Sequence, residues 1–534
     1  MGVDGHQLLY TAAAVLLAVL LFTTLRTPVI RRNGMPLRKP PNTLPLAGNG
    51  ILFLQARRKL FAWFVKCQRQ FGYETFQVAV PTLPPGVVIN DPRILDFVFK
   101  SEGALISKGS FVKGMLWDLF GHGIVNADGD IWRVQRKAGL AFLNTANIRI
   151  LTDIALPKHL AEILVLLGTS ADTKDKEVDL QAVFHELTSC IMGKMAYNME
   201  MHADDDFTMA FDFASEKTTE RFQNPLWPVT ETVSGLFSRV GGAAELRRSL
   251  AIVKAFGRRI VSTAVADKQT HHGHPGSIGK DKERTSADKV EEVSGSLIHS
   301  LLESISDQDV VADAALNYLS AGRDTVAQAL TWTFYMLMKN PRIVDKIRRE
   351  VQQVLDKQGD GSQDIVPHLA RLAPAAMPYT MATFYEGLRL FPPIPFEIKQ
   401  VEADLLVLPD GTELVKGSLV IWCSWALNRS KETWGDDADE FRPERWLTES
   451  TDPAATSARL TSRSPSEFPV FHGGPRACLG KKMAESMAIQ SMAAVAWSFD
   501  FRLVNPDEER VTRTSLTLPM EGGLPCYVQS RAFS

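Results

Sequence analysis

Cysteine is scarce in this sequence of 534 residues, and its five copies are scattered. They are Cys67, Cys190, Cys423, Cys478 and Cys526, with no Cys-x-x-Cys pair among them. This odd and widely spaced set is neither a disulfide framework nor a zinc ribbon, and it suits a reducing compartment. A long basic stripe is also missing, and the formal net charge is only -2. The sequence therefore argues against nucleic acid as the main partner.

The sequence also lacks internal repeats and any clear linker within its core. Hydrophobic residues make up 45% of it, which is enough for one large packed core. Polar stretches predict three surface loops, at residues 267–295, 356–364 and 448–467. The first contains His271, His272 and His274, where the surrounding glycine and lysine favour a solvated loop over a metal site.

The N-terminal segment 5–25 carries no formal charge and is mostly apolar. At about 1.5 Å per residue, a helix of this length spans roughly 30 Å, the thickness of a bilayer core. The basic residues that follow place that flank in the cytosol: Arg26, Arg31, Arg32, Arg38 and Lys39. A cleaved signal peptide is the alternative, but the usual basic residues before the apolar run are missing. We predict a membrane anchor at 1–30, a basic and proline-rich hinge at 31–50 and one large domain at 51–534.

Helical patterns dominate the large domain. Residues 309–339 form a long helix candidate that Asn340 and Pro341 stop. A second helix follows at once, with one apolar face made of Ile343, Ile347, Val351 and Val354. The clearest strand signal is the β-branched and aromatic run 413–422. These patterns predict a mostly helical domain.

Two patterns stand out within predicted helices. Glu386 and Arg389 lie three apart among apolar residues, so a buried pair is an alternative to a surface ion pair. A buried arginine needs further partners, and the motif "FRPERW" offers Arg445. In "SAGRDT", Gly322 makes the helix less stable than alanine would. A group that packs closely against the backbone at this position would explain why the residue is a glycine.

Two further patterns have equally plain alternatives. Asp324 and Thr325 form an acid and alcohol pair that could pass protons, whereas a kinked helix with a solvated aspartate is the simpler interpretation. Trp132 and Arg136 lie four apart on one helix face and could donate hydrogen bonds to carboxylates. An amphipathic basic helix would have the same pattern.

The run "FHGGPRACLG" at residues 471–480 raises the sharpest question. A turn needs its glycines and its proline, but it does not need Arg476 or Cys478. On these ten residues alone, a buried structural thiol and a functional thiolate are equally good interpretations.

The order of these motifs decides between the alternatives. Trp132-x-x-x-Arg136, the run 321–325, Glu386-x-x-Arg389, the run 443–446 and the cysteine loop 471–480 occur in one sequence. Together they closely resemble a eukaryotic, membrane-anchored cytochrome P-450, from Pro40 to the C-terminus. The resemblance implies a mainly α fold with small β-sheets, the cytochrome P-450 fold, behind one N-terminal transmembrane helix. One departure is Trp446, where the family more often has phenylalanine and where we expect no effect on the chemistry.

The resemblance implies a haem b cofactor (iron protoporphyrin IX) with Cys478 as the axial iron ligand, whose thiolate favours O–O cleavage. The residues that would bind or approach the haem are Trp132, Arg136, Gly322, Phe471, Gly474, Arg476 and Gly480. The helix after Cys478 is expected to favour its thiolate. Glu386, Arg389 and Arg445 match a structural triad, while Asp324 and Thr325 match the pair that delivers protons during oxygen activation.

The resemblance also implies insertion of one oxygen atom from O₂ into a C–H bond, with electrons from NADPH through a reductase. Arg133, Lys137, Lys481 and Lys482 could attract that reductase, or could simply form a solvated face. The catalytic domain would be cytosolic, on a single-pass anchor in the endoplasmic reticulum membrane.

The sequence looks most like the plant and fungal group that hydroxylates long-chain fatty acids or alkanes at or near the chain end. Apolar residues are expected to line the substrate pocket: Phe111, Leu116, Leu119, Phe120, Ile124, Ala321, Ile394 and Phe396. A sterol or terpenoid is the alternative substrate. A haem isomerase that needs no reductase and a non-enzymatic haem-binding membrane protein are the other classes of function.

Overall fold

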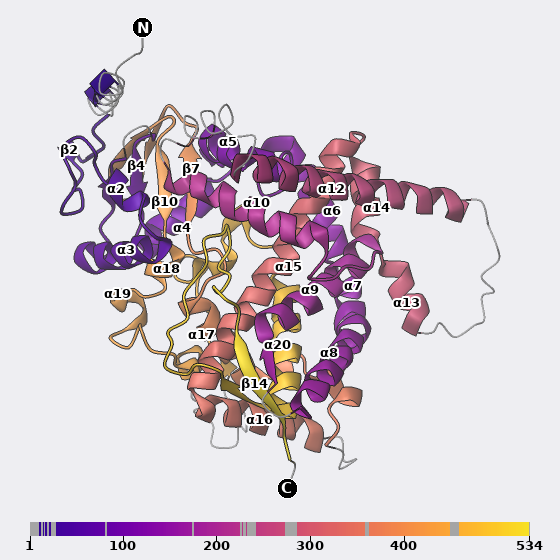
Figure 1. The fold of residues 1–534 in the computed structure, drawn as a ribbon. Helices are drawn as coiled ribbons and strands as arrows, with labels where there is room; N and C mark the ends of the chain where they lie inside the picture. Colours follow the sequence, from indigo (N-terminus) through magenta and orange to yellow (C-terminus); the bar gives the residue numbers. More distant parts are fainter. Residues whose placement is uncertain are drawn as a thin grey trace.

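The computed structural model places a strand-rich part beside a larger helical part (Figure 1). It describes residues 10–11, 14, 17–18, 21–22, 28–80, 83–173, 176–224, 227, 231, 242–272, 286–357, 363–448 and 459–532. The predicted mainly helical fold with small sheets is confirmed in these ranges.

The long helix α15 (Gln308–Lys339) runs through the middle of the helical part (Figure 1). It begins where the Asp307 carboxylate accepts a hydrogen bond from the backbone N–H of Asp309, and it ends at Asn340 before a proline. Most of its side chains are buried, which fits a helix that other elements surround on all sides. The predicted helix at 309–339 is therefore confirmed.

Four long helices pack against α15: α9 (Leu180–Tyr197), α12 (Gly242–His272), α17 (Pro378–Leu390) and α20 (Lys481–Ser498). Buried aromatic contacts fix these faces. Phe184 of α9 packs on Phe334 with ring centroids 5.0 Å apart, and Trp332 stacks on Phe391 at 4.3 Å. The Tyr197 hydroxyl donates to the Ala315 carbonyl at 2.7 Å. These contacts hold α15 in register with the elements that carry the site.

The second predicted helix is α16 (Pro341–Asp356), and its expected apolar face is buried. Further α-helices are α2 (Gly50–Phe53), α3 (Arg57–Phe71), α4 (Pro92–Ser101), α5 (Gly109–Phe120), α6 (Gly129–Phe142), α7 (Thr145–Ile150), α8 (Leu156–Ala171), α10 (Asp206–Gln223), α13 (Ser286–Val293), α14 (Ser296–Ser304), α18 (Ser424–Leu427) and α19 (Lys431–Trp434). Short tighter or wider turns are η1 (Leu151–Ala155), η2 (Val366–Arg371), η3 (Pro374–Ala376), η4 (Pro443–Trp446), η5 (Pro469–Phe471) and η6 (Gly474–Arg476).

The described strands form four small sheets. Their orders are β2-β1-β9-β8, β3-β4-β10-β7-β5, β11-β12 and β13-β14-β6. The strands are β1 (Arg31–Arg32), β2 (Met35–Pro36), β3 (Phe76–Val78), β4 (Gly86–Val88), β5 (Ile106–Ser107), β6 (Glu177–Asp179), β7 (Glu397–Val401), β8 (Leu405–Val407), β9 (Thr412–Val415), β10 (Leu419–Trp422), β11 (Leu447–Thr448), β12 (Arg459–Leu460), β13 (Phe499–Leu503) and β14 (Pro525–Ser530). The pairing of β10 with β4 is parallel, whereas the other strand pairs are antiparallel.

The single strand predicted at 413–422 is wrong, because the run divides into β9 and β10 in two different sheets. Gly417 lies between them with a φ of +86°, a left-handed conformation that turns the chain. Side chains of β9 alternate between buried and exposed, whereas all four residues of β10 are buried. The apolar composition that suggested one strand therefore belongs to two strands with different surroundings.

The surface loop predicted at 267–295 is also partly wrong. Helix α12 continues to His272, and α13 occupies Ser286–Val293. His274 and the rest of 273–285 lie outside the described residues. Parts of the other two predicted loops, residues 358–362 and 449–458, also lie outside the described residues.

The N-terminal predictions meet the structure only in part. Most of the predicted anchor, residues 5–25, lies outside the described residues, and no helix among the described ones is long and apolar enough to cross a membrane. Within the predicted hinge at 31–50, β1 pairs with β9, and Arg32 forms an ion pair with Glu74 at 2.6 Å. Strand pairing thus joins this segment to the large domain.

Candidate active site

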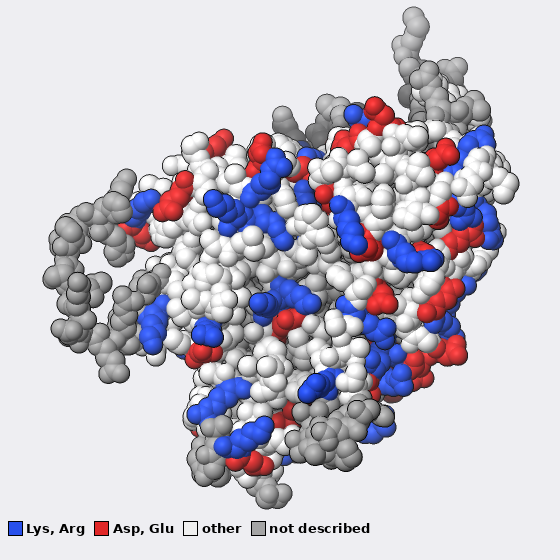
Figure 2. Space-filling model, turned by 180° about the vertical axis from the view of Figure 1, so that it is seen from behind, with Lys and Arg blue, Asp and Glu red and all other residues white. Residues whose placement is uncertain are grey.

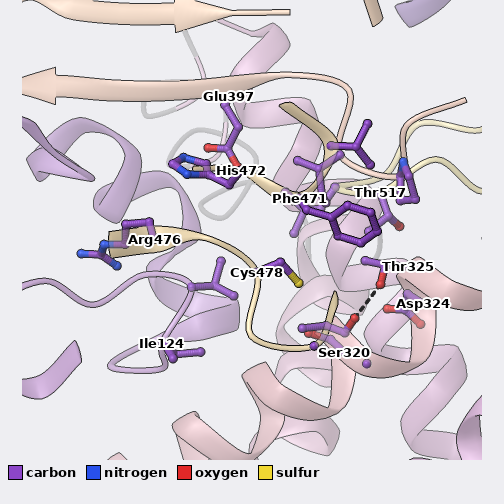
Figure 3. Close-up of a pocket in the computed structure, with 18 of the residues that line it drawn as sticks. Ile124, Ser320, Asp324, Thr325, Glu397, Phe471, His472, Arg476, Cys478 and Thr517 are labelled. Carbon is purple, nitrogen blue, oxygen red and sulfur yellow. Dashed lines mark hydrogen bonds between the residues drawn. The ribbon is translucent and has the colours of Figure 1, made fainter. Parts of the chain in front are cut away.

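A cavity of about 490 Å³ lies between α15 and the cysteine loop, which comprises residues 471–480. We call it the central cavity. Figure 3 shows the Cys478 sulfur pointing into it, towards the segment of α15 that carries Ser320, Asp324 and Thr325. Much of its wall is apolar, and charged side chains are confined to a few positions. This arrangement brings one thiol to the floor of a mostly apolar chamber.

Close packing on α4 shapes the cysteine loop. The backbone N–H of Cys478 donates to the Phe471 carbonyl at 2.8 Å and closes the loop. A Cβ on Gly474, whose φ is +61°, would lie 2.2 Å from the Phe99 carbonyl oxygen, and one on Gly473 would lie 2.4 Å from the Phe99 ring. His472 itself adopts a φ of +56°, which is uncommon for a residue other than glycine. Both glycines are therefore needed where the loop touches α4.

The Cys478 thiol is open to the central cavity although protein surrounds it. Burial raises the pKa of Cys478, while the backbone N–H of Gly480 and the charge of Arg136 oppose that shift. The sequence led us to expect that the start of α20 favours the thiolate. The Gly480 N–H at the start of α20 does lower the pKa of Cys478, but desolvation of the thiolate is the larger effect and leaves this pKa raised. Metal binding would displace the proton, since the thiolate is the ligand.

Trp132, Arg136 and Arg476 come together on one wall of the central cavity, as predicted. The guanidinium carbons of Arg136 and Arg476 lie 5.5 and 4.3 Å from the Trp132 ring centroid. Arg136 donates to the Ala477 carbonyl at 2.8 Å, next to the cysteine. Arg476 forms an ion pair with Asp128, so it already has one carboxylate partner. A carboxylate ligand could bind beside both guanidinium groups.

Sequence reasoning missed a cluster of charged and titratable groups on the same side of the cavity. Lys399 forms an ion pair with Glu102 at 2.9 Å, and Lys108 lies 3.5 Å from Glu397. Although burial favours its neutral form, Lys108 and Lys399 lower the pKa of Glu397 to about 2. Burial lowers the pKa of His472 to about 4, so its imidazole is neutral at physiological pH. The mixed polar and apolar sequence of β7, Glu-Ile-Lys-Gln-Val, gave no clear signal that Lys399 is buried.

The residues around Cys478 fit a haem. The thiol is the kind of donor that binds iron, and Arg136 and Trp132 offer donors for carboxylates beside it. A Cβ on Gly480 would have only the Cys478 sulfur near it, at 4.0 Å, so the space beside the sulfur is open. Phe471 also lines this space (Figure 3). An iron porphyrin requires open space beside a thiol, and the structure provides it here.

Asp324 and Thr325 both reach the cavity wall, but each has its own partner. The Thr325 hydroxyl donates to the Ala321 carbonyl at 2.7 Å, the bond drawn in Figure 3. The Asp324 carboxylate accepts from Arg323 Nε at 2.6 Å and lies 4.0 Å from the Nδ1 atom of His185. Burial raises the pKa of Asp324 to about 6, against the attraction of Arg323. This carboxyl can therefore exchange a proton near neutral pH.

Helix packing explains why residue 322 is a glycine, and the sequence did not reveal this contact. A Cβ at this position would lie 2.5 Å from the sulfur of Met192 on α9. The backbone of Gly322 also lines the central cavity. The glycine permits the close approach of α9, and the predicted room for dioxygen stays a prediction.

Glu386, Arg389 and Arg445 form the contact predicted for them. Glu386 and Arg389 have no exposed side-chain surface, and Glu386 accepts from Arg389 Nε at 2.8 Å and Nη2 at 2.7 Å. Arg445 Nε and the backbone N–H of Arg442 each donate to Glu386 at 2.9 Å. The indole N–H of Trp446 donates the remaining bond, also at 2.9 Å. The tryptophan thus has a structural role that phenylalanine could not fill.

Aromatic packing connects this triad to the cysteine loop. The Trp446 ring packs on Phe468 with centroids 4.8 Å apart, and Tyr385 lies 5.7 Å from Phe468 and 6.5 Å from Phe471. The Tyr385 hydroxyl also donates to Glu485 of α20 at 2.5 Å. Helix α17 is therefore tied to both ends of the loop that carries Cys478.

The cavity wall includes six of the predicted substrate residues: Leu116, Phe120, Ile124, Ala321, Ile394 and Phe396. Phe111 and Leu119 are not on it. Helix periodicity explains the error, because residues four apart share one face of α5. The face that lines the cavity carries Val112, Leu116 and Phe120. Leu119 lies off this face and is fully buried in the core, and Phe111 packs against the core as well. Val112 was missed although its spacing could have found it.

Two further parts of the wall were also missed. Helix α10 contributes residues at helical spacing: Phe211, Ser215, Thr219 and Phe222. The segment 515–517 and the start of α3, including Arg57, complete the wall. Periodicity could have identified the α10 face, but nothing in the sequence brings 515–517 next to α3.

The four basic residues suggested for a reductase surface are all exposed: Arg133, Lys137, Lys481 and Lys482. Arg133 pairs with Asp130, and Lys481 lies 3.8 Å from Glu485. Figure 2 shows one face of the molecule, on which basic groups are interspersed with acidic and uncharged ones instead of forming a continuous stripe.

Comparison with known proteins identifies the family. The cytochrome P-450 family model matches residues 38–526. Cytochrome P-450 94A1 of Vicia sativa is 28% identical over 502 residues, covering 92% of this chain and 90% of the relative. Cytochrome P-450 CYP94D109 of Paris polyphylla is 30% identical, covering 84% and 86%. The fungal cytochrome P-450 monooxygenase cyp1 of Mycosarcoma maydis is 29% identical, covering 88% and 70%. With a thiol, cations and an acid and alcohol pair around one cavity, this chain belongs to the cytochrome P-450 family of monooxygenases.

Proposed function

We propose that this chain hydroxylates a long-chain fatty acid or alkane at or near the chain end. One observation carries the proposal: the Cys478 sulfur and the Asp324–Thr325 pair face each other across a cavity whose wall is mostly apolar. The sequence resemblance to the plant and fungal lipid-hydroxylase group supports the substrate class. Membership of the family implies haem, O₂, a redox partner and a small-molecule substrate.

Haem, when bound, supplies the activation of O₂ that inserts one oxygen atom into a C–H bond and releases the other as water. Cys478 would hold the iron, and Trp132, Arg136 and Arg476 would hold the haem carboxylates. The glycine at 480 would leave room for the porphyrin edge. These side chains would hold the cofactor in the cavity that α15 also lines.

Asp324 and Thr325 would manage the protons that the reaction consumes. Asp324, with a pKa near 6, can take a proton from its buried surroundings and release it again. The Thr325 hydroxyl now donates to the Ala321 carbonyl, and it must turn away from that carbonyl to donate into the cavity. The pair would therefore hold a proton at the carboxyl oxygen and pass it through the hydroxyl.

The apolar wall would hold the hydrocarbon and exclude water. Leu116, Phe120 and Ile124 come from α5 and the residues after it, and Ile394 and Phe396 come from the proline-rich exit of α17. Burial of apolar chain atoms on such a wall contributes about 0.8 kcal/mol per CH₂ group. A sterol or terpenoid would also find apolar contacts there, so that class is the alternative.

We further propose electron supply from NADPH through a reductase, with Arg133, Lys137, Lys481 and Lys482 as the docking cations. The uncharged segment 5–25 and its basic flank support an N-terminal anchor at 1–30. The catalytic domain would then be cytosolic, at the endoplasmic reticulum membrane.

Incubation of the haem-loaded protein with reductase, NADPH and a panel of fatty acids, alkanes and sterols tests the proposal. Mass spectrometry should detect a hydroxylated fatty acid or alkane that depends on NADPH and is absent for Cys478→Ala. If only sterols are oxidised, the alternative substrate class, a sterol or terpenoid, is supported instead. Turnover of a lipid without NADPH and reductase would indicate an isomerase instead.

A further inference from the structure

Arg57, the first residue of α3, is a buried cation on the wall of the central cavity. Only 7% of its surface is exposed. Its wall neighbours are mainly apolar and aromatic: Phe53, Leu60, Phe61 and Leu516. A guanidinium group in such surroundings needs partners that compensate for its lost hydration.

The partners that Arg57 has are all uncharged. Its Nη1 atom donates to the carbonyls of Ser515 and Thr517, the latter at 2.9 Å, and its guanidinium carbon lies 5.1 Å from the Phe61 ring centroid. Within the described parts of the chain, Nε and Nη2 make no hydrogen bond, and no carboxylate lies within ion-pair distance. The N–H groups on Nε and Nη2 are therefore left for a ligand.

The electrostatic surroundings of Arg57 destabilise a positive charge at this position. The first turn of α3 contains no acidic residue, and Arg58 and Lys59 follow Arg57 directly. The positive end of the helix dipole lies here as well. Burial lowers the pKa of Arg57 to about 10, which still leaves the guanidinium charged at neutral pH. An anion at this end of the cavity would offset both the burial and the dipole.

The other cations of the cavity wall have a carboxylate partner or lie where the haem carboxylates are expected. Three of them pair with carboxylates: Lys108 with Glu397, Lys399 with Glu102, and Arg476 with Asp128. Arg136 has no carboxylate partner among the described residues, but it bonds to Ala477 beside Cys478, where the haem carboxylates are expected. The carboxylates on the wall, Asp324 and Glu397, already have cations. Arg57 is left as a charge for which neither the described residues nor the proposed haem provides a counterion.

We propose that Arg57 binds the carboxylate of a long-chain carboxylic acid, whose hydrocarbon then extends along the apolar wall towards Cys478. The inference rests on the proposed lipid hydroxylation and narrows its substrate class from fatty acids, alkanes and sterols to acids. A carboxylate would accept from Nε and Nη2 together, the bidentate geometry that arginine favours. With the charged end held at Arg57, the far end of the chain is the part left to reach the thiol.

Binding of hexadecanoic acid and of its methyl ester to the haem-loaded protein tests the inference, because the two differ only in the charge of one end. Affinity is measured from the change in haem absorption on titration. In Arg57→Gln, which keeps an N–H donor for the Ser515 and Thr517 carbonyls, the acid should bind about 10- to 100-fold more weakly. The affinity for the ester should stay within about twofold, which also shows that the cavity is intact. Arg57→Lys should retain part of the affinity for the acid, because the charge remains without the fork.

Arg58→Gln is the matched control, because this neighbour on α3 is exposed and absent from the cavity wall. It should bind acid and ester as the unaltered protein does. The inference is overturned if the unaltered protein does not prefer the acid, or if Arg57→Gln weakens acid and ester equally. Failure of the proposed function has a different signature: the acid binds through Arg57, yet reductase and NADPH yield no oxidised lipid.

Discussion

Replacement of Glu386 by alanine should be among the most damaging single changes outside the cavity. The Glu386 carboxylate is fully buried and accepts five hydrogen bonds, from Arg389 (two), Arg445, Arg442 and Trp446. Arg389 is equally buried and would keep only the carbonyls of Asn428, Ala438 and Glu440 as partners. An uncompensated buried charge costs about 3–5 kcal/mol. The total free energy of unfolding of a domain is only about 5–15 kcal/mol.

The assay compares the haem content and the denaturant midpoint of Glu386→Ala with those of the unaltered protein. Glu444→Ala is the matched control, because Glu444 lies in η4 next to Arg445 and forms a partly exposed ion pair with Lys346 at 2.5 Å. Such pairs contribute about 0–1 kcal/mol, so the control should load haem normally. Full haem content and an unchanged midpoint in Glu386→Ala would refute the reasoning that the triad supports the cysteine loop.

Three further changes probe the site and its support. Trp446→Phe should lower the free energy of unfolding by about 2 kcal/mol, because it removes one donor to a buried carboxylate; denaturation that matches the unaltered protein would contradict this. Thr325→Ala should fold, bind haem and consume NADPH, but it should release more hydrogen peroxide and less product per NADPH, since the proton donor is lost. Unchanged coupling, measured with a bound substrate, would remove Thr325 from the mechanism. Native Asp324 holds its proton up to a pKa of about 6, whereas the unfolded chain releases it near 3.8. The stability of the unaltered protein relative to Asp324→Asn should therefore fall as the pH rises from about 4 to 6, and a flat or rising difference in denaturation experiments would contradict the assigned shift.

Local signals made much of the helical framework predictable. The acidic cap and the Asn340-Pro341 stop fix the ends of α15, and its expected bounds differ from the observed ones by one residue. The Glu386–Arg389 spacing and the apolar residues around it pointed correctly to a buried pair. These features depend on residues within a few turns of one another, which is why composition and spacing suffice.

The features that the sequence did not predict depend on distant parts of the chain. Arg57 meets Ser515 at a separation of 458 positions, and neither segment has a pattern that indicates the other. The burial of Lys399 and the contact of Gly322 with Met192 likewise depend on how separate elements pack. The break at Gly417 was missed for another reason, since apolar composition continues across it while the backbone turns. Tertiary packing, not local preference, decides such positions.

The carbon monoxide spectrum of the reduced protein tests the central claim most directly, because it reports the ligand of the haem iron. The unaltered protein should give the red-shifted band that is typical of thiolate ligation, and Cys190→Ala, which changes a thiol away from the cavity, should keep it. Cys478→Ala should lose that band. Persistence of the band in Cys478→Ala would show that another residue holds the iron and would contradict the account of this site.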